Sequence, residues 1–189
     1  MYKDIACRYF EKPGPKNTKD TLVAVSKRAK ELGIKTVVLA TTKGDTAFEA
    51  LDVFGPEIQI VAVTHWTGYR GPNDQELSQE KRRELQSKGC AVFTGQHAFS
   101  GVGRSVREKF GTYQLGEIIA NALKVFGEGT KVAIEVSLMA ADAGMVRTGE
   151  DAIAIGGTGT GADTALVLQP VNSNKFFDLV VKEIICKPA

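Results

Sequence analysis

The sequence predicts an α/β fold, a three-layer α/β/α sandwich built on a mixed, mostly parallel sheet. Its first half alternates short β-branched runs with helical patterns, and that order predicts parallel strands joined by right-handed crossovers. The final strand patterns follow one another without a helix between them, so part of the sheet should be antiparallel. Because no repeat, low-complexity tract or linker divides the 189 residues, we expect a single domain over residues 1–189.

The first elements follow from turn chemistry and apolar spacing. A short alternating strand ends near Phe10, and a segment rich in Pro and Gly then breaks it. Asn17 or Thr18 can cap the next helix, whose apolar stripe ends at Gly33, a residue suited to a left-handed helix stop.

Strands and helices then alternate. Residues 34–40 and 58–64 are short, β-branched runs typical of buried parallel strands, and residues 47–54 form a helical pattern between them. A strongly charged surface helix over 76–88 precedes a fourth strand at 90–93.

The second half carries one ambiguous segment. Residues 131–143 alternate like a strand but also show a helical apolar stripe, and the stop at Gly144 favours a helix. Helices are also expected at 105–110 and 113–126, and strands at 153–155, at 164–169 and from Phe177 to Cys186.

Charge and cysteine content bound the class of protein. The balance of 24 basic against 22 acidic residues is too even to predict binding to nucleic acid or to an anionic membrane. The three cysteines form no CxxC pair, which favours reduced thiols in a cytoplasmic protein. Neither a charged-then-apolar leader nor a run of membrane-spanning length is present, so we expect a soluble, intracellular chain.

The most distinctive stretch is Gly156 to Thr164, which holds four glycines and three threonines between two apolar runs. Glycine lets backbone N–H groups approach an anion, and threonine adds hydroxyl donors, so a phosphate cradle is one interpretation. A glycine-rich turn joining two strands is the other. From this stretch alone the two are equally supported.

Four such segments should meet at one edge of the sheet. Ligands of open α/β sheets bind beyond the carboxyl ends of the strands. Segments rich in glycine and in small or hydroxylated residues follow four of the predicted strands, at 41–46, at Thr64, at 94–104 and at 156–164. Both histidines fall there, and with no third ligand they do not predict a metal site. Among the basic residues we favour Arg104 as a phosphate ligand. The candidate ligand-binding residues are Asn17, Thr18, Thr41, Thr42, Gly44, Thr46, Thr64, His65, His97, Ser100, Gly101, Arg104, Gly157, Thr158, Gly159 and Gly161.

Other reactive residue types receive structural interpretations. Cys90 lies at the opposite end of its strand and reads as core packing, while Asp142 and Asp163 suit capping or turn roles. The glycine-rich stretch lacks the lysine of a Walker loop and the G-x-G-x-x-G spacing, and neither G-x-S-x-G nor H-E-x-x-H occurs.

The run from Val37 to Ala47, with the strand 60–64 after it, resembles the C-terminal domain of pyruvate kinase. That resemblance implies that the threonine–glycine turn holds a phosphate of a sugar-bisphosphate effector and that residues 157–164 close over the same ligand. Asp45 departs from the pattern, because an acidic residue pointing inward would repel a phosphate. The chain has no counterpart of the catalytic barrel, so kinase activity is not implied.

Nearly the whole chain resembles a small family of stand-alone archaeal and bacterial proteins of this fold. The resemblance is carried by residues 13–18, 97–104, 139–144 and the glycine-rich stretch. It implies a site for flavin mononucleotide (FMN). Phe99, Trp66 or Tyr69 could then lie against the isoalloxazine ring.

Two functions follow as expectations. The first is an FMN-binding protein, with flavin-dependent oxidoreductase activity as an open extension. The second is a regulatory module for a phosphorylated metabolite such as a sugar phosphate. A hydrolase using His65 or His97 has no nucleophile constellation behind it and ranks last. The expected partner is thus a small phosphorylated ligand, and an exposed edge strand allows a homo-oligomer.

Overall fold

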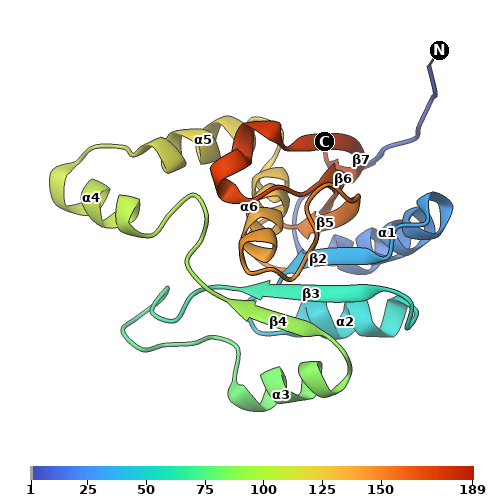
Figure 1. Cartoon of the computed structure of the whole chain (residues 1–189), viewed down its shortest axis with the longest axis horizontal. Coiled ribbons are helices and arrows are strands. Elements are labelled where there is room, and N and C mark those ends of the chain that lie inside the picture. Colours follow the sequence, from blue (N-terminus) through green and yellow to red (C-terminus); the bar gives the residue numbers. More distant parts are fainter. Residues whose placement is uncertain (1) are drawn as a thin grey trace.

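The computed structural model describes residues 2–189 and consists of one seven-stranded sheet with helices on both faces (Figure 1). The strands are β1 (Arg8–Phe10), β2 (Thr36–Ala40), β3 (Gln59–Thr64), β4 (Ala91–Thr94), β5 (Ala152–Gly156), β6 (Thr164–Gln169) and β7 (Val180–Pro188). The helices are η1 (Pro15–Asn17), α1 (Thr18–Leu32), α2 (Asp45–Val53), α3 (Gln79–Ser87), α4 (Val102–Phe110), α5 (Leu115–Lys124), α6 (Glu128–Asp142) and η2 (Ser173–Asp178).

The sheet is mixed and mostly parallel, as predicted. Its strand order is β1-β7-β6-β5-β2-β3-β4. Strand β2 pairs parallel with β3 and β5, and β3 pairs parallel with β4. The pairs β5–β6 and β6–β7 are antiparallel, because β5 and β6 are joined by a short loop and no helix returns the chain between them.

The side chains of strand β2 point alternately to the two faces of the sheet and contact both helix layers. Val37 and Leu39 pack into a core with α1, α2 and α3, while Val38, between them, packs against α6 on the other face. All three side chains are fully buried. A strand covered on both faces has no polar side, which is why residues 34–40 read as a continuous apolar run.

The ambiguous segment 131–143 is helical and belongs to α6. This helix lies against the sheet on one side and against α5 and η2 on others. Eleven of the thirteen residues from Gly129 to Ala141 are therefore buried, all except Lys131 and Val132. A helix buried around most of its circumference needs apolar residues on several faces, and its sequence then also fits a strand pattern.

Some predicted boundaries were wrong. Phe177 does not begin the last strand, because residues 173–178 form a 3₁₀ turn in which Phe176 packs inward and Phe177 is exposed. That turn is held by the Asp142 carboxylate, which accepts from the amide of Asn172 (3.1 Å) and the backbone N–H of Ser173 (2.9 Å). The carboxylate therefore has the capping role expected of it, and these hydrogen bonds help keep its pKa below the usual range despite the opposing effect of burial.

Helix ends follow their caps. Gly33 ends α1 in the left-handed conformation, as predicted. Helix α3 begins at Gln79 rather than near 76, because the Ser78 hydroxyl accepts from the backbone N–H of Lys81 and sets the helix start there. Asn17 occupies the N-cap position of α1, but its amide donates to the Lys12 carbonyl and does not cap the helix. Within residues 2–189, no helix combines the length and apolarity that a bilayer crossing would need.

Candidate functional site

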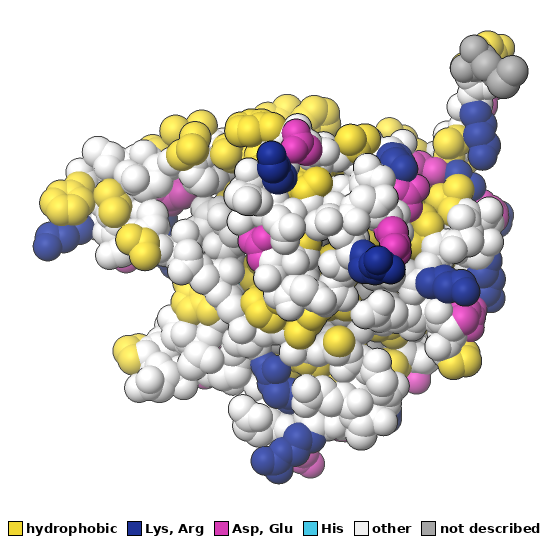
Figure 2. All heavy atoms as spheres, in the orientation of Figure 1, with side chains coloured by type: hydrophobic (Ala, Val, Ile, Leu, Met, Phe, Trp, Pro, Cys, Tyr) yellow, Lys and Arg dark blue, Asp and Glu magenta, His cyan; other side chains and the backbone are white. Residues whose placement is uncertain are grey.

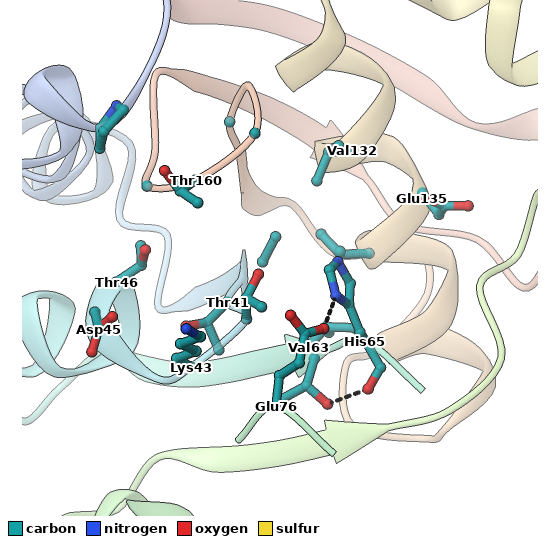
Figure 3. A pocket seen from close by; sticks show the side chains of 18 of the residues that line it. Thr41, Lys43, Asp45, Thr46, Val63, His65, Glu76, Val132, Glu135 and Thr160 are labelled. Atoms are coloured by element: carbon teal, nitrogen blue, oxygen red, sulfur yellow. Dashed lines mark hydrogen bonds and ion pairs between the residues drawn. The ribbon is translucent and has the colours of Figure 1, made fainter. Parts of the chain in front are cut away.

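A cavity of about 830 Å³ opens at the carboxyl ends of β2 and β3, and elements from across the sequence enclose it (Figure 3). In Figure 3 the turn that carries Thr41 and Lys43 faces the loop that carries Thr160, and α6 supplies a further side through Val132 and Glu135. Most of the predicted ligand-binding residues line this one space. They are Thr18, Thr41, Thr42, Thr46, Thr64, His65, His97, Gly157, Gly159 and Gly161.

The turn after β2 leaves donors available. The N–H of Thr41 donates to the Val63 carbonyl (2.9 Å), and the Thr41 hydroxyl accepts from the N–H of Gly44 (3.1 Å), which closes the turn against β3. Helix α2 begins directly afterwards, and its first-turn N–H groups at Asp45 and Thr46 have no acceptor elsewhere in residues 2–189. The turn is therefore held by its own hydrogen bonds, and the backbone N–H groups that follow it remain free to bind a ligand.

One cation beside this turn is uncompensated. Lys43 lines the cavity, and no ion pair involving it occurs in the part of the chain that the structure describes. Asp45, the acidic departure from the kinase pattern, is exposed and pairs with Lys81 (3.0 Å). That pairing offsets the repulsion an acidic side chain would exert on a phosphate in the turn.

The glycine-rich loop is braced from behind. The buried Asp163 carboxylate accepts from the N–H groups of Gly14 (2.9 Å) and Thr158 (3.1 Å). The Thr18 hydroxyl accepts from the N–H of Ala162 (3.0 Å). Asp163 therefore has the turn-forming role expected of it, and residues 14–18 hold the loop in place.

Packing explains a key glycine of this loop. Gly161 has a φ of +71°, and a Cβ there would lie 2.6 Å from the Cα of Pro15. A side chain would thus strain the backbone and collide with residues that cannot move away. The loop is held more firmly than a simple hairpin turn, because Gly161 allows it to pack closely against Pro15 while Gly159 and Thr160 remain on the cavity side.

Aromatic rings gather on another part of the cavity. His65 stacks on Tyr69 with ring centroids 4.0 Å apart, and Trp66 meets His97 edge-on at 4.6 Å. His65, Tyr69 and His97 line the cavity, while Trp66 supports them. Phe99 does not belong to this group. It is buried, packs edge-on against Phe176 (5.5 Å) and lies outside the cavity lining, unlike Tyr69.

Two carboxylates at the site were missed by sequence reasoning. The Glu76 carboxylate lies 2.6 Å from His65 Nδ1, and this contact fixes the ring as Figure 3 shows. Glu135 of α6 is buried, pairs with Lys131 and accepts from the N–H of Phe99 (3.0 Å). Sequence reasoning favoured a helix for residues 131–143 without giving Glu135 a role, and it placed Glu76 at the start of a charged surface helix, so neither carboxylate was assigned to the site.

His97 is held neutral. Burial lowers its pKa from the ordinary 6.5 to about 4, and the Glu135 carboxylate only partly opposes that shift. At neutral pH the ring therefore offers one donor and one acceptor nitrogen and carries no charge. It can hydrogen-bond to a polar heteroaromatic edge, and it adds no positive charge that would attract a phosphate.

The remaining predicted residues lie outside the lining. Arg104 pairs with Glu108 (3.2 Å) and its guanidinium lies 5.3 Å from the centroid of Tyr69, so it supports the aromatic wall from outside. Arg104, which we favoured as a phosphate ligand, thus lies outside the cavity lining, whereas Lys43 belongs to it. Also outside the lining are Asn17, Gly44, Ser100, Gly101 and Thr158.

The geometry of residues 2–189 supports neither a metal site nor a reactive thiol at Cys90. Those residues contain no cluster of three His, Cys, Asp or Glu side chains that could hold a metal ion. Cys90 is buried at the start of β4, and burial raises the pKa of its thiol to about 11, which fits the predicted packing role.

Comparison with known proteins identifies the family. Residues 19–168 match the family described as pyruvate kinase, alpha/beta domain. Among solved structures, Cryptosporidium parvum pyruvate kinase in complex with ADP is 17% identical with a TM-score of 0.44, over 85% of this chain and 25% of that one. A second structure of the kinase from that organism is 15% identical with a TM-score of 0.41, over 84% and 24%. The chain thus spans about a quarter of the length of these kinases. Because the family match covers most of its residues, the chain belongs to the pyruvate kinase alpha/beta domain family.

Proposed function

We propose that the chain binds FMN in this cavity, with the phosphate at the Thr41–Thr46 turn and the isoalloxazine ring against His65, Tyr69 and His97. One observation carries the proposal: a single cavity joins unpaired cationic and N–H donors to a wall of stacked aromatic rings. A sugar phosphate would use the donors and leave the aromatic wall without a function.

The donor end suits a phosphate on electrostatic grounds. The N–H groups of Asp45 and Thr46 open a helix, and an anion there gains about 0.3–1 kcal/mol from the helix dipole. Lys43 would add a charge-assisted hydrogen bond, and the Thr42 hydroxyl, which also lines the cavity, can contribute a further donor.

The aromatic end suits a flavin ring. A volume of about 830 Å³ falls in the range of cofactor pockets, and His65 is held against Tyr69 by its contact with Glu76. A neutral His97 can pair with a polar ring edge without introducing charge. When bound, FMN would supply one- or two-electron redox chemistry, and these residues would orient its ring.

A regulatory module for a phosphorylated metabolite is the second candidate. The observation that favours it is the acidic share of the lining, because Glu49 and Glu128 could accept hydrogen bonds from sugar hydroxyl groups. This candidate predicts that sugar phosphates raise the melting temperature more than FMN does, since a ligand selective for the folded state stabilises it.

The test is to identify and then titrate the ligand. We expect mass spectrometry of the ligand released on denaturation to detect FMN, and added FMN to lose fluorescence on saturable binding to stripped protein. Purified protein that carries no flavin and takes up none would contradict the proposal. Stabilisation by sugar phosphates alone would instead support the second candidate.

A further inference from the structure

Helices α4 and α5 form an arm that projects from the body of the sheet (Figure 1). No residue of α4 is buried, and only Ala120 of α5 is. Six large apolar side chains at this arm, here called the arm patch, are each more than half exposed: Val102 (72%), Phe110 (65%), Leu115 (72%), Ile118 (56%), Val125 (81%) and Phe126 (59%).

Helix α5 is apolar on two sides, and the fold covers only one of them. Ala120 packs towards α6 together with Ile119 and Leu123. Leu115 and Ile118 lie three positions apart on another stripe, which Val125 continues two turns later and which has no partner in residues 2–189. The apolar stripe of a surface helix normally packs against a partner, so the outer stripe of α5 indicates a second contact that residues 2–189 do not supply.

The arm patch supplies much of the apolar surface that a stable contact needs. Figure 2 shows hydrophobic side chains along the edge of the molecule over α5 and again at the tip of α4. The largest apolar patch of a typical monomer covers about 300–600 Å², and a standard interface buries about 800 Å² on each partner. Six aliphatic and aromatic side chains exposed to this extent supply a substantial part of that area.

The charges of the arm favour a protein surface over a membrane. Arg107 pairs with Glu117 (2.6 Å), and Lys124 pairs with Glu128 (3.0 Å). Residues 102–128 contain four basic and three acidic side chains, which is far from the excess of basic charge that draws a helix to an anionic bilayer. A surface whose charges are already paired internally does not repel an identical surface.

We propose that the chain forms a two-fold dimer through the arm patch, with α5 packed against α5 of a second copy. A two-fold axis places the same patch on both partners, so the outer stripe of α5 covers its own counterpart. The segment between β4 and α4 carries His97, so the contact would also steady one wall of the cavity. This inference rests on the arm alone and is independent of the ligand.

Analytical ultracentrifugation of the full chain tests the proposal. The wild type should sediment at twice the monomer mass of 20.3 kDa. The double substitution Leu115→Glu with Ile118→Glu should raise the dimer Kd by about a hundredfold or more, because it places charges at the centre of the interface. Val23→Glu, at a half-exposed apolar position on α1, is the matched control and should leave the mass unchanged.

The possible results distinguish a second copy of the chain from a lipid surface as the partner of the arm patch. A monomeric wild type at about 100 µM, a concentration well above the Kd of a standard interface, would overturn the proposal. So would a dimer that survives the double substitution or that Val23→Glu disrupts. Binding of a monomeric wild type to phosphatidylcholine vesicles would reassign the patch to a lipid surface. Circular dichroism of each variant guards against unfolding, and Val125→Glu, at the far end of the stripe, should reproduce the dissociation.

Discussion

The Thr41–Thr46 turn and the Gly157–Gly161 loop are both built largely from threonine and glycine and line the same cavity, yet they are held in different ways. In the turn, the Thr41 hydroxyl closes the backbone and the donors of α2 stay unpaired. In the loop, the donors of Thr158 and Ala162 are consumed by Asp163 and Thr18, and Gly161 is required by its contact with Pro15.

The difference teaches that glycine and threonine content alone does not identify a phosphate site. What distinguishes the turn is that its unpaired N–H groups begin a helix and lie beside an uncompensated Lys43. The loop instead forms one wall of the cavity and is held in place by its hydrogen bonds to Asp163 and Thr18. Substitutions in the two regions should therefore affect different properties, stability in the loop and affinity in the turn.

The largest expected effect is on stability, at Gly161. Gly161→Ala should lower the free energy of unfolding by about 3 kcal/mol, because it adds backbone strain at positive φ to a collision with Pro15. Gly159→Ala is the matched control, since Gly159 also has positive φ (+78°) but open space around it, and should cost about 1 kcal/mol. Urea unfolding measures both. Equal losses at the two glycines would mean that packing against Pro15 does not determine the loop.

Acid should lower the free energy of unfolding by protonating His97, which lies among the aromatic residues of the cavity. The pKa of His97 is about 4 in the folded chain against 6.5 unfolded, so the unfolded state binds more protons between those values. Stability contributed by the neutral ring is complete above pH 6.5 and is lost as pH falls through about 4. We expect this group to account for about 2 kcal/mol of the loss, after allowance for partial solvent access.

The corresponding variant is His97→Asn, which cannot titrate. Unfolding free energies measured between pH 4 and 7 should show a shallower decline for His97→Asn than for the wild type. An unchanged slope would show that groups other than His97 determine the acid sensitivity.

The smallest energetic effect is on affinity, at Lys43. Lys43→Ala should weaken FMN binding about tenfold, the loss expected for one charge-assisted hydrogen bond of about 1.4 kcal/mol, and should leave stability unchanged. Lys35→Ala, at the opposite end of β2, is the control and should alter neither. If both lysines had the same effect on titration, overall charge and not the turn would attract the phosphate.

Sequence reasoning predicted the layers and the meeting of the polar segments, because strand alternation and carboxyl-end geometry are local patterns with general rules. It did not find Glu76 or Glu135, whose roles depend on distant partners, His65 in one case and the backbone of Phe99 in the other. It favoured Arg104 because of the glycines before it, but the register of α4 pairs that side chain with Glu108.

The most direct test of the central claim compares FMN with riboflavin, which lacks the phosphate. If the turn binds phosphate while His65, Tyr69 and His97 contact the ring, the wild type should bind both and bind FMN at least tenfold more tightly. Lys43→Ala should narrow that gap by weakening FMN alone. Equal affinities of the wild type for the two ligands, or no binding of either, would contradict the account.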